Sequence, residues 1–213
     1  MESFDRPAFV SACDAAFELA SDPAVAAAWD TESACPGMTV GGLTHHLLGQ
    51  IRHIAALMQV PPTTIPPIPL LDHYDRAAWV SSALDDEANT SIRDEENAAA
   101  ADGPAAVLVD FPSLLELLPE LVTTPRSPDT ILIPWQGWTL TTDDFFATRS
   151  MELVVHSDDL AASVGLPTPE FPEPIATHAA ALLAGIAMRR HGQAAVVRAL
   201  SRPQRAPGNV SAF

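Results

Sequence analysis

The chain has 213 residues, of which 47% are hydrophobic and 18% are charged. This composition excludes a disordered chain, and no apolar run approaches the ~20 residues that a membrane-spanning helix needs. The eleven basic residues, all arginines, face 27 acidic ones, which gives a formal net charge of −16 at pH 7. Because this charge repels phosphate backbones and anionic membranes, we expect neither nucleic acid nor a membrane as a partner.

The first residues and the cysteines indicate the compartment. Residues 1–7 lack a basic segment followed by an apolar one, so nothing marks the chain for export and we expect a cytoplasmic protein. The two cysteines, Cys13 and Cys35, have no CxxC spacing, and free thiols are the default in a cytosol. We expect both to be structural and neither to lie beside a functional site.

Proline and glycine divide the sequence into segments with apolar residues at every third or fourth position, as in amphipathic helices. The predicted helices are, in chain order, 7–29, 40–58, 72–101, 105–122 with a bend near Pro112, 141–164, and a segment after Pro174 that breaks near His191 and resumes to residue 200. Thr141 and the acidic residues after it suit the start of the 141–164 helix, and Gly165 suits its end.

A short β-hairpin is the exception to this helical pattern. β-Branched and aromatic residues at 131–133 and 138–140 flank the turn-like sequence Pro-Trp-Gln-Gly. No repeat or linker divides the chain, so we predict one mostly all-α domain over residues 1–213. Its expected architecture is an up-and-down helix bundle with a short β-hairpin and an extra C-terminal helix.

One line along the predicted 141–164 helix is polar although apolar side chains flank it on both sides. At about 100° per residue, four side chains fall on this line, namely Arg149, Glu152, His156 and Asp159. Burying an unpaired carboxylate or imidazole costs several kcal/mol, so these groups need partners. One interpretation is an Arg149–Glu152 ion pair beside a hydrogen-bonded His156, and the other is a metal site.

The metal interpretation needs a third ligand, because catalytic zinc keeps three protein ligands and one open position. On the predicted 40–58 helix, His46 lies at the flank of the apolar stripe, where it can face a neighbouring helix, and His53 lies two turns further on. His45 falls on the opposite side. A half-exposed surface histidine is the commoner role for His46 or His53 alone. The spacing therefore leaves both the kind of site and its third residue open.

Two stretches of the chain resemble the motifs of one family. Residues 38–47, MTVGGLTHHL, resemble the pattern W-T-V-x-D-L-x-x-H-L, and residues 148–161, TRSMELVVHSDDLA, resemble T-R-x-x-E-x-x-V-H-x-x-D-L-A. These patterns are typical of DinB-like bundles, specifically of the mycothiol-dependent maleylpyruvate isomerase family. Met38 replaces the usual Trp, and Gly41-Gly42 replaces a polar pair that includes Asp.

The resemblance implies a DinB-like bundle in which His46, Glu152 and His156 bind one divalent metal, usually Zn²⁺. It also implies a mycothiol-type thiol as cosubstrate, whose sulfur would occupy the open metal position. We count Glu152, Arg149 and Asp159 as candidate catalytic residues. Asp159 is expected to orient His156 or to bond to a neighbouring helix. Arg149 is expected to pair with Glu152, with a substrate carboxylate as its alternative partner.

We therefore expect a metal- and thiol-dependent transferase or isomerase that acts on a small electrophile, with S-transfer favoured over isomerisation. The chain is shorter than family members with a C-terminal α/β extension, so maleylpyruvate itself is not implied. A metal-water hydrolase and a non-catalytic metal-binding or ligand-binding bundle are the alternatives. The expected partners are the small electrophile and the small thiol, with a homodimer left open.

Overall fold

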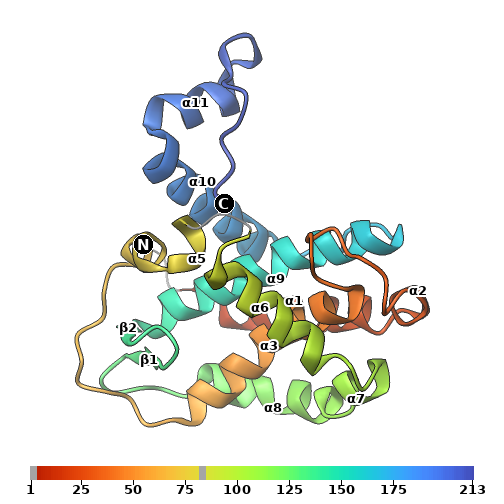
Figure 1. Ribbon diagram of the computed structural model, residues 1–213. Coiled ribbons are helices and arrows are strands. Elements are labelled where there is room, and N and C mark those ends of the chain that lie inside the picture. The colour runs from red at the N-terminus through yellow and green to blue at the C-terminus, as the bar shows by residue number, and fades with distance from the viewer. Residues whose placement is uncertain (1–3, 82–84) are drawn as a thin grey trace.

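The computed structural model describes residues 4–81 and 85–213, and it is built mainly of helices (Figure 1). The first half contains α1 (Arg6–Ala20), α2 (Pro23–Ala27), α3 (Val40–Gln59), α4 (Leu70–Arg76), α5 (Ala78–Ser81), α6 (Glu87–Ala99), α7 (Pro104–Leu108) and α8 (Phe111–Thr123). The second half contains strands β1 (Ile131–Ile133) and β2 (Trp138–Leu140), then α9 (Thr142–Val164), α10 (Glu173–His191), α11 (Gln193–Ser201) and the 3-10 helix η1 (Pro203–Arg205). The prediction of a mostly all-α bundle with a short hairpin is confirmed.

The bundle core forms where α1, α3, α8 and α9 pack against one another, with α6 on α3 and α10 on α9 (Figure 1). Helix α3 contributes fully buried residues at helical spacing, including Leu47 and Ile51, and α9 contributes Phe146 and Leu153. Each such side chain stabilises the fold by about 1.5–3 kcal/mol through its burial. In the described ranges, no helix combines the length and the apolarity that crossing a bilayer requires.

Helix α9 has the boundaries that its sequence predicts. The Thr141 hydroxyl accepts a hydrogen bond from the Asp144 amide at 3.1 Å, which caps the free N–H groups of the first turn. At the other end, Gly165 adopts a left-handed conformation with φ of 72°, which an L side chain disfavours. The antiparallel hairpin, with Ile131 opposite Leu140, delivers the chain to the start of α9.

Two predicted helices are wrong because each is interrupted. Within 7–29, Pro23 cannot continue α1, and the Asp22 carboxylate instead caps α2 by accepting from the Ala24 amide at 2.7 Å. Within 72–101, the chain forms α4, α5 and α6 rather than one helix. The buried Ala77 turns to an extended conformation after α4, so tertiary packing overrides a helix-compatible composition there. Residues 82–84 of this prediction lie outside the described residues.

The other two helix interruptions agree with the sequence. The 105–122 segment divides into α7 and α8 at residues 109–110, just before Pro112, which occupies the first turn of α8. The C-terminal segment breaks at Gly192, which has φ of 84° and separates α10 from α11. Pro112 and Gly192 thus mark these two interruptions, whereas Pro119 lies inside α8 without ending it.

Two adjacent glycines allow close packing at the start of α3. Thr39 caps the helix by accepting from the Gly42 amide at 2.9 Å, and the Asn97 side-chain oxygen accepts from the Thr39 amide at 2.9 Å. A Cβ on Gly41 would lie 2.6 Å from the indole of Trp29, and one on Gly42 would overlap Asn97. The glycines thus let Trp29 and α6 approach the turn that precedes His46.

This packing predicts opposite effects for two glycine-to-alanine changes in α3. Gly41→Ala should destabilise the protein by about 1–3 kcal/mol, because the Trp29 ring is buried and cannot move away freely. Gly49→Ala, where no atom lies within 4 Å of the added Cβ, should stabilise it by about 0.5–1 kcal/mol. Urea unfolding of both variants measures the difference, and equal effects would contradict the close packing.

Candidate metal centre

Three of the predicted site residues converge between α3 and α9. His46 comes from α3, and Glu152 and His156 come from successive turns of α9. One potential ligand atom from each residue lies within 4.8 Å of the other two. The imidazoles of His46 and His156 are nearly perpendicular at 85°, and His156 Nε2 lies 3.0 Å from a Glu152 oxygen. The convergence places two ring nitrogens and one carboxylate around a common point.

Each of these histidines has a carboxylate on its other ring nitrogen. His46 Nδ1 lies 2.9 Å from Glu96 Oε1, and His156 Nδ1 lies 3.1 Å from Asp159 Oδ2. A carboxylate that accepts from Nδ1–H fixes the tautomer and the ring orientation, and it directs Nε2 toward the centre. Asp159 therefore contacts His156, which was one of its two expected roles.

Glu96 was not identified from the sequence. It lies on α6 and accepts hydrogen bonds from the Nδ1 atoms of both His45 and His46. The sequence showed only a segment rich in Asp, Glu and Asn, and no motif in it separated Glu96 from the acidic residues beside it. Only the packing of α6 on α3 shows that Glu96 faces the two histidines of α3.

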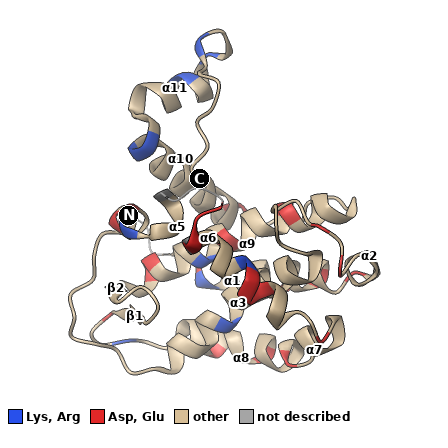
Figure 2. Ribbon diagram, in the orientation of Figure 1, with Lys and Arg blue, Asp and Glu red and all other residues tan. Residues whose placement is uncertain are grey.

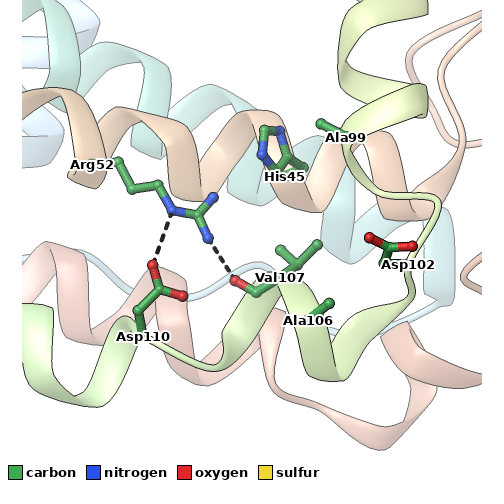
Figure 3. A pocket seen from close by; sticks show the side chains of 7 residues that line it. All are labelled: His45, Arg52, Ala99, Asp102, Ala106, Val107 and Asp110. Carbon is green, nitrogen blue, oxygen red and sulfur yellow. Dashed lines mark hydrogen bonds and ion pairs between the residues drawn. The ribbon is translucent and has the colours of Figure 1, made fainter.

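His45 lines a surface hollow of about 360 Å³, whose lining includes none of the predicted metal ligands among the described residues (Figure 3). Arg52 crosses this hollow and donates a hydrogen bond to the Val107 carbonyl at 2.7 Å. The carboxylates of Asp102 and Asp110 lie in its lining. His45 lines this hollow together with Arg52, near which the sequence placed it, and Glu96 joins it to His46.

The partners of Glu152 and His156, both largely buried, favour the ionised form of each group. Burial alone would raise the pKa of Glu152, but the hydrogen bond and charge of His156, with the charge of Arg149, lower it to about 2. Burial alone would lower the pKa of His156, but its hydrogen bonds to Asp159, Cys35 and Glu152 raise that pKa well above the usual value. His156 therefore carries a proton that a metal ion would have to displace.

The expected ion pair between Arg149 and Glu152 is wrong. Within the described residues, no carboxylate lies within 4.0 Å of the Arg149 guanidinium. Arg149 Nη1 donates instead to the side-chain oxygen of Gln50 at 2.5 Å, and its Nε donates to the Thr148 hydroxyl at 3.1 Å. The Gln50 amide nitrogen in turn donates to the His46 carbonyl at 2.9 Å. Gln50, which the sequence did not single out, thus connects Arg149 to the candidate ligand His46.

Cys35 corrects a second expectation, because it does lie beside the site. Its thiol donates to Asp159 Oδ2 at 3.4 Å, and Cys35, Asp159 and His156 form a second compact group of potential ligand atoms. The loop that carries Cys35 is tied to α9 by a 2.8 Å hydrogen bond from the Ala34 amide to the Ser163 hydroxyl. The sequence could not predict this contact because it joins a turn to a helix over 100 residues away.

His53 and His73 lie near the hairpin and outside the triad. His53 stacks on Trp135 at 4.5 Å, its buried Nδ1 has no hydrogen-bond partner in the described structure, and burial lowers its pKa to about 4. His73 Nδ1 accepts from the Trp138 indole at 3.0 Å, and burial lowers its pKa to about 4 as well. The structure therefore brings His46, and not His53, to Glu152 and His156.

These features define a helix-bundle protein with a candidate two-histidine, one-glutamate metal centre between two core helices. Residues 10–161 match the family model described as "Mycothiol maleylpyruvate isomerase N-terminal domain". The match covers more than half of the chain and includes both ligand-bearing helices, so the chain belongs to this family, and the resemblance of the two motifs is confirmed. No curated protein and no solved structure matches the chain significantly.

The buried, neutral His73 predicts a pH dependence of stability. Its folded pKa of about 4 lies below the ordinary histidine pKa of 6.5, so the unfolded chain binds more protons between these two pH values. The free energy of unfolding should therefore fall as pH is lowered through this window, with about 1–3 kcal/mol attributable to His73. His73→Gln keeps an acceptor for Trp138 and should make the fall shallower. Urea unfolding across the window measures it, and an unchanged pH dependence in the variant would refute this assignment.

Proposed function

We propose that the chain is a metal-dependent enzyme that uses a small thiol of the mycothiol type to transfer sulfur to, or isomerise, a small electrophilic substrate. The observation that carries this proposal is the convergence of His46, Glu152 and His156, with Nε2 of both histidines directed inward by carboxylates. Membership of the mycothiol-related family supports the choice of thiol.

The donor set of the triad fits a zinc ion. Zinc accepts two imidazoles and one carboxylate at about 2.0–2.2 Å and keeps its fourth position for water or a substrate. Ligands at such distances in a tetrahedron lie about 3.4 Å apart, and the three donor atoms here lie within 4.8 Å of one another. Small side-chain adjustments would therefore complete the coordination without moving α3 or α9.

A zinc ion bound there would lower the pKa of a coordinated thiol and supply a sulfur nucleophile at neutral pH. The chain's own residues have two tasks around it. Glu96 orients the His46 imidazole and Asp159 orients the His156 imidazole, each by accepting a hydrogen bond from the Nδ1 atom of the ring. Glu152 stays ionised and offers its carboxylate as a ligand. Cys35 faces the outward Nδ1 side of His156, so we assign the nucleophile to the external thiol and not to Cys35.

Arg149 is the proposed contact for an anionic group of the substrate. Its side chain is only 8% exposed, yet its hydrogen-bond partners, Gln50 and Thr148, are neutral. A buried cation without a carboxylate partner is costly, and a bound anion would offset this cost. Gln50 also contacts His46, so an anion on Arg149 would lie near the candidate metal ligands. We therefore propose an electrophile that carries a carboxylate.

The metal assignment predicts which variants lose metal. The purified protein should bind one divalent ion per chain, and His46→Ala, Glu152→Ala and His156→Ala should each abolish stoichiometric binding. His53→Ala, which removes a histidine from the same helix as His46, should retain it. Metal analysis after dialysis, with circular dichroism as the test of folding, decides the assignment. Undiminished metal in the His46 and His156 variants would exclude the triad.

The orienting carboxylate gives a graded form of the same test. Glu96→Gln should weaken zinc affinity by about 10–100-fold, because the amide no longer fixes the His46 tautomer. Glu95→Gln, an exposed neighbour on α6, should leave the affinity unchanged. Affinity should also fall as pH is lowered, because protonated His156 must release its proton to bind metal. Equal affinities in the two variants would show that Glu96 does not orient a ligand.

The thiol requirement predicts both activity and a spectrum. Conjugation of an electrophile such as monochlorobimane should need metal and mycothiol together, and Glu152→Ala should abolish it with the helices intact. Mycothiol added to the cobalt-substituted protein should give a sulfur-to-cobalt charge-transfer band. Turnover at the same rate without thiol would instead indicate a metal-hydroxide hydrolase. No turnover and no band would indicate a binding protein.

A further inference from the structure

Helix α11 and η1, in the C-terminal part of the chain, project away from the bundle (Figure 1). The last residues return to it, where Ala212 is buried and the Phe213 ring lies 4.9 Å from that of Trp79. We define the C-terminal arm as residues 188–213, which include the end of α10, all of α11 and η1. Helix α11 packs mainly on α10 and η1, at the far end of α10 from the bundle core (Figure 1). The family match ends at residue 161, so the arm lies outside the matched region that carries the candidate ligands.

The charge of the arm is opposite to that of the rest of the chain. It carries five of the eleven arginines and no acidic residue, whereas residues 1–187 carry six arginines and all 27 acidic residues. Figure 2 shows the arginines along α10 and α11 and the acidic residues over the bundle. Arg198, Arg202 and Arg205 form no ion pair within the described residues. These three cations are therefore available to an external partner.

The arm also exposes apolar side chains at helical spacing. Leu200 is 77% exposed and Val197, one turn earlier on α11, is 50% exposed. Their neighbours Arg198 and Arg202 are exposed as well. Isolated apolar residues on a surface need no explanation, but an apolar pair flanked by unpaired arginines on a projecting helix indicates a docking face.

A complementary surface lies along α3, α7 and α8. Two adjoining hollows share Arg52 and Asp110, one of about 360 Å³ (Figure 3) and one of about 400 Å³, and we call them together the α3–α8 groove. Leu114 and Leu117 line its second half, and Leu117 is 40% exposed. Exposed carboxylates accompany these apolar residues on either side of α7 and on α8, namely Asp102, Asp110, Glu116 and Glu120.

We propose that the C-terminal arm of one copy of this chain docks α11 into the α3–α8 groove of a second copy. Leu200 and Val197 would cover Leu117, and the arginines would face the carboxylates that flank α7 and those on α8. The arm and the groove lie at opposite ends of the bundle, so an arm does not reach the groove of its own chain (Figure 1). Because each chain has one arm and one groove, two copies can make the contact reciprocally and close as a dimer.

The charge distribution favours a second copy over an anionic membrane. A membrane or nucleic acid would attract the arm but repel the bundle, whose residues 1–187 carry six arginines against 27 acidic residues. A second copy instead offers both the carboxylates and the exposed leucine. Because the contact joins opposite charges near the protein surface, it should weaken as ionic strength rises.

Sedimentation velocity of the full chain over a range of concentrations tests this proposal. The parent protein should be in a monomer–dimer equilibrium that shifts toward monomer at high salt. Leu200→Asp should abolish the dimer, and Arg202→Glu should weaken it about tenfold. Arg76→Glu, the same charge change at an exposed position on α4, should leave it unchanged. Circular dichroism should show parent-like helix content in all variants, because the substituted side chains are exposed.

Cross-linking identifies the surface that receives the arm. In a Cys35→Ser background, Leu200→Cys protein mixed with Leu117→Cys protein should form a disulfide between the two chains on mild oxidation. Ser21→Cys, on the exposed turn after α1, replaces Leu117→Cys as the control and should not cross-link. A chain that stays monomeric, or a dimer that Leu200→Asp and Arg202→Glu leave intact, would overturn the proposal. Binding of the monomer to phosphatidylserine vesicles would overturn it in favour of a membrane.

Discussion

The buried contact between Glu152 and His156 is the constraint on which the rest of the site depends. Both groups lie on the face of α9 that packs into the bundle, where an unpaired charge would cost several kcal/mol. His156 satisfies Glu152 and is itself held by Asp159 on its other nitrogen. His46 on α3 lies beside this pair, and Glu96 on α6 accepts a hydrogen bond from His46 Nδ1, as Asp159 does from His156. Hydrogen bonds among these carboxylates and imidazoles thus link α6 to α3 and stabilise the packed face of α9.

The same contacts give the charged groups of the site partners within the chain. The ionised Glu152 and the protonated His156 neutralise each other, so the site needs no ion to satisfy its buried groups. A metal ion that bound here would have to displace the proton from His156, so its affinity would depend on pH. Arg149 differs, because its described hydrogen-bond partners are the neutral Gln50 and Thr148. The charges of Glu152 and His156 therefore balance each other, whereas the charge of Arg149 favours binding of an anion.

Helix geometry made much of this site predictable. The polar line on α9 and the position of His46 follow from 100° per residue, and the caps of α9 follow from Thr141 and Gly165. Glu96, Gln50 and Cys35 were missed because tertiary packing, and not spacing along one helix, brings them to the centre. The 72–101 helix failed for a related reason, since the buried Ala77 breaks a stretch whose composition suits a helix.

X-ray absorption of the zinc-loaded protein tests the central claim most directly. The account predicts two imidazole nitrogens and one carboxylate oxygen at about 2.0–2.2 Å, with a light-atom ligand in the fourth position. Addition of mycothiol should replace that fourth ligand with one sulfur at about 2.3 Å and leave the other three in place. A site without imidazole ligands, or a spectrum that the thiol leaves unchanged, would contradict a thiol-accepting centre at His46, Glu152 and His156.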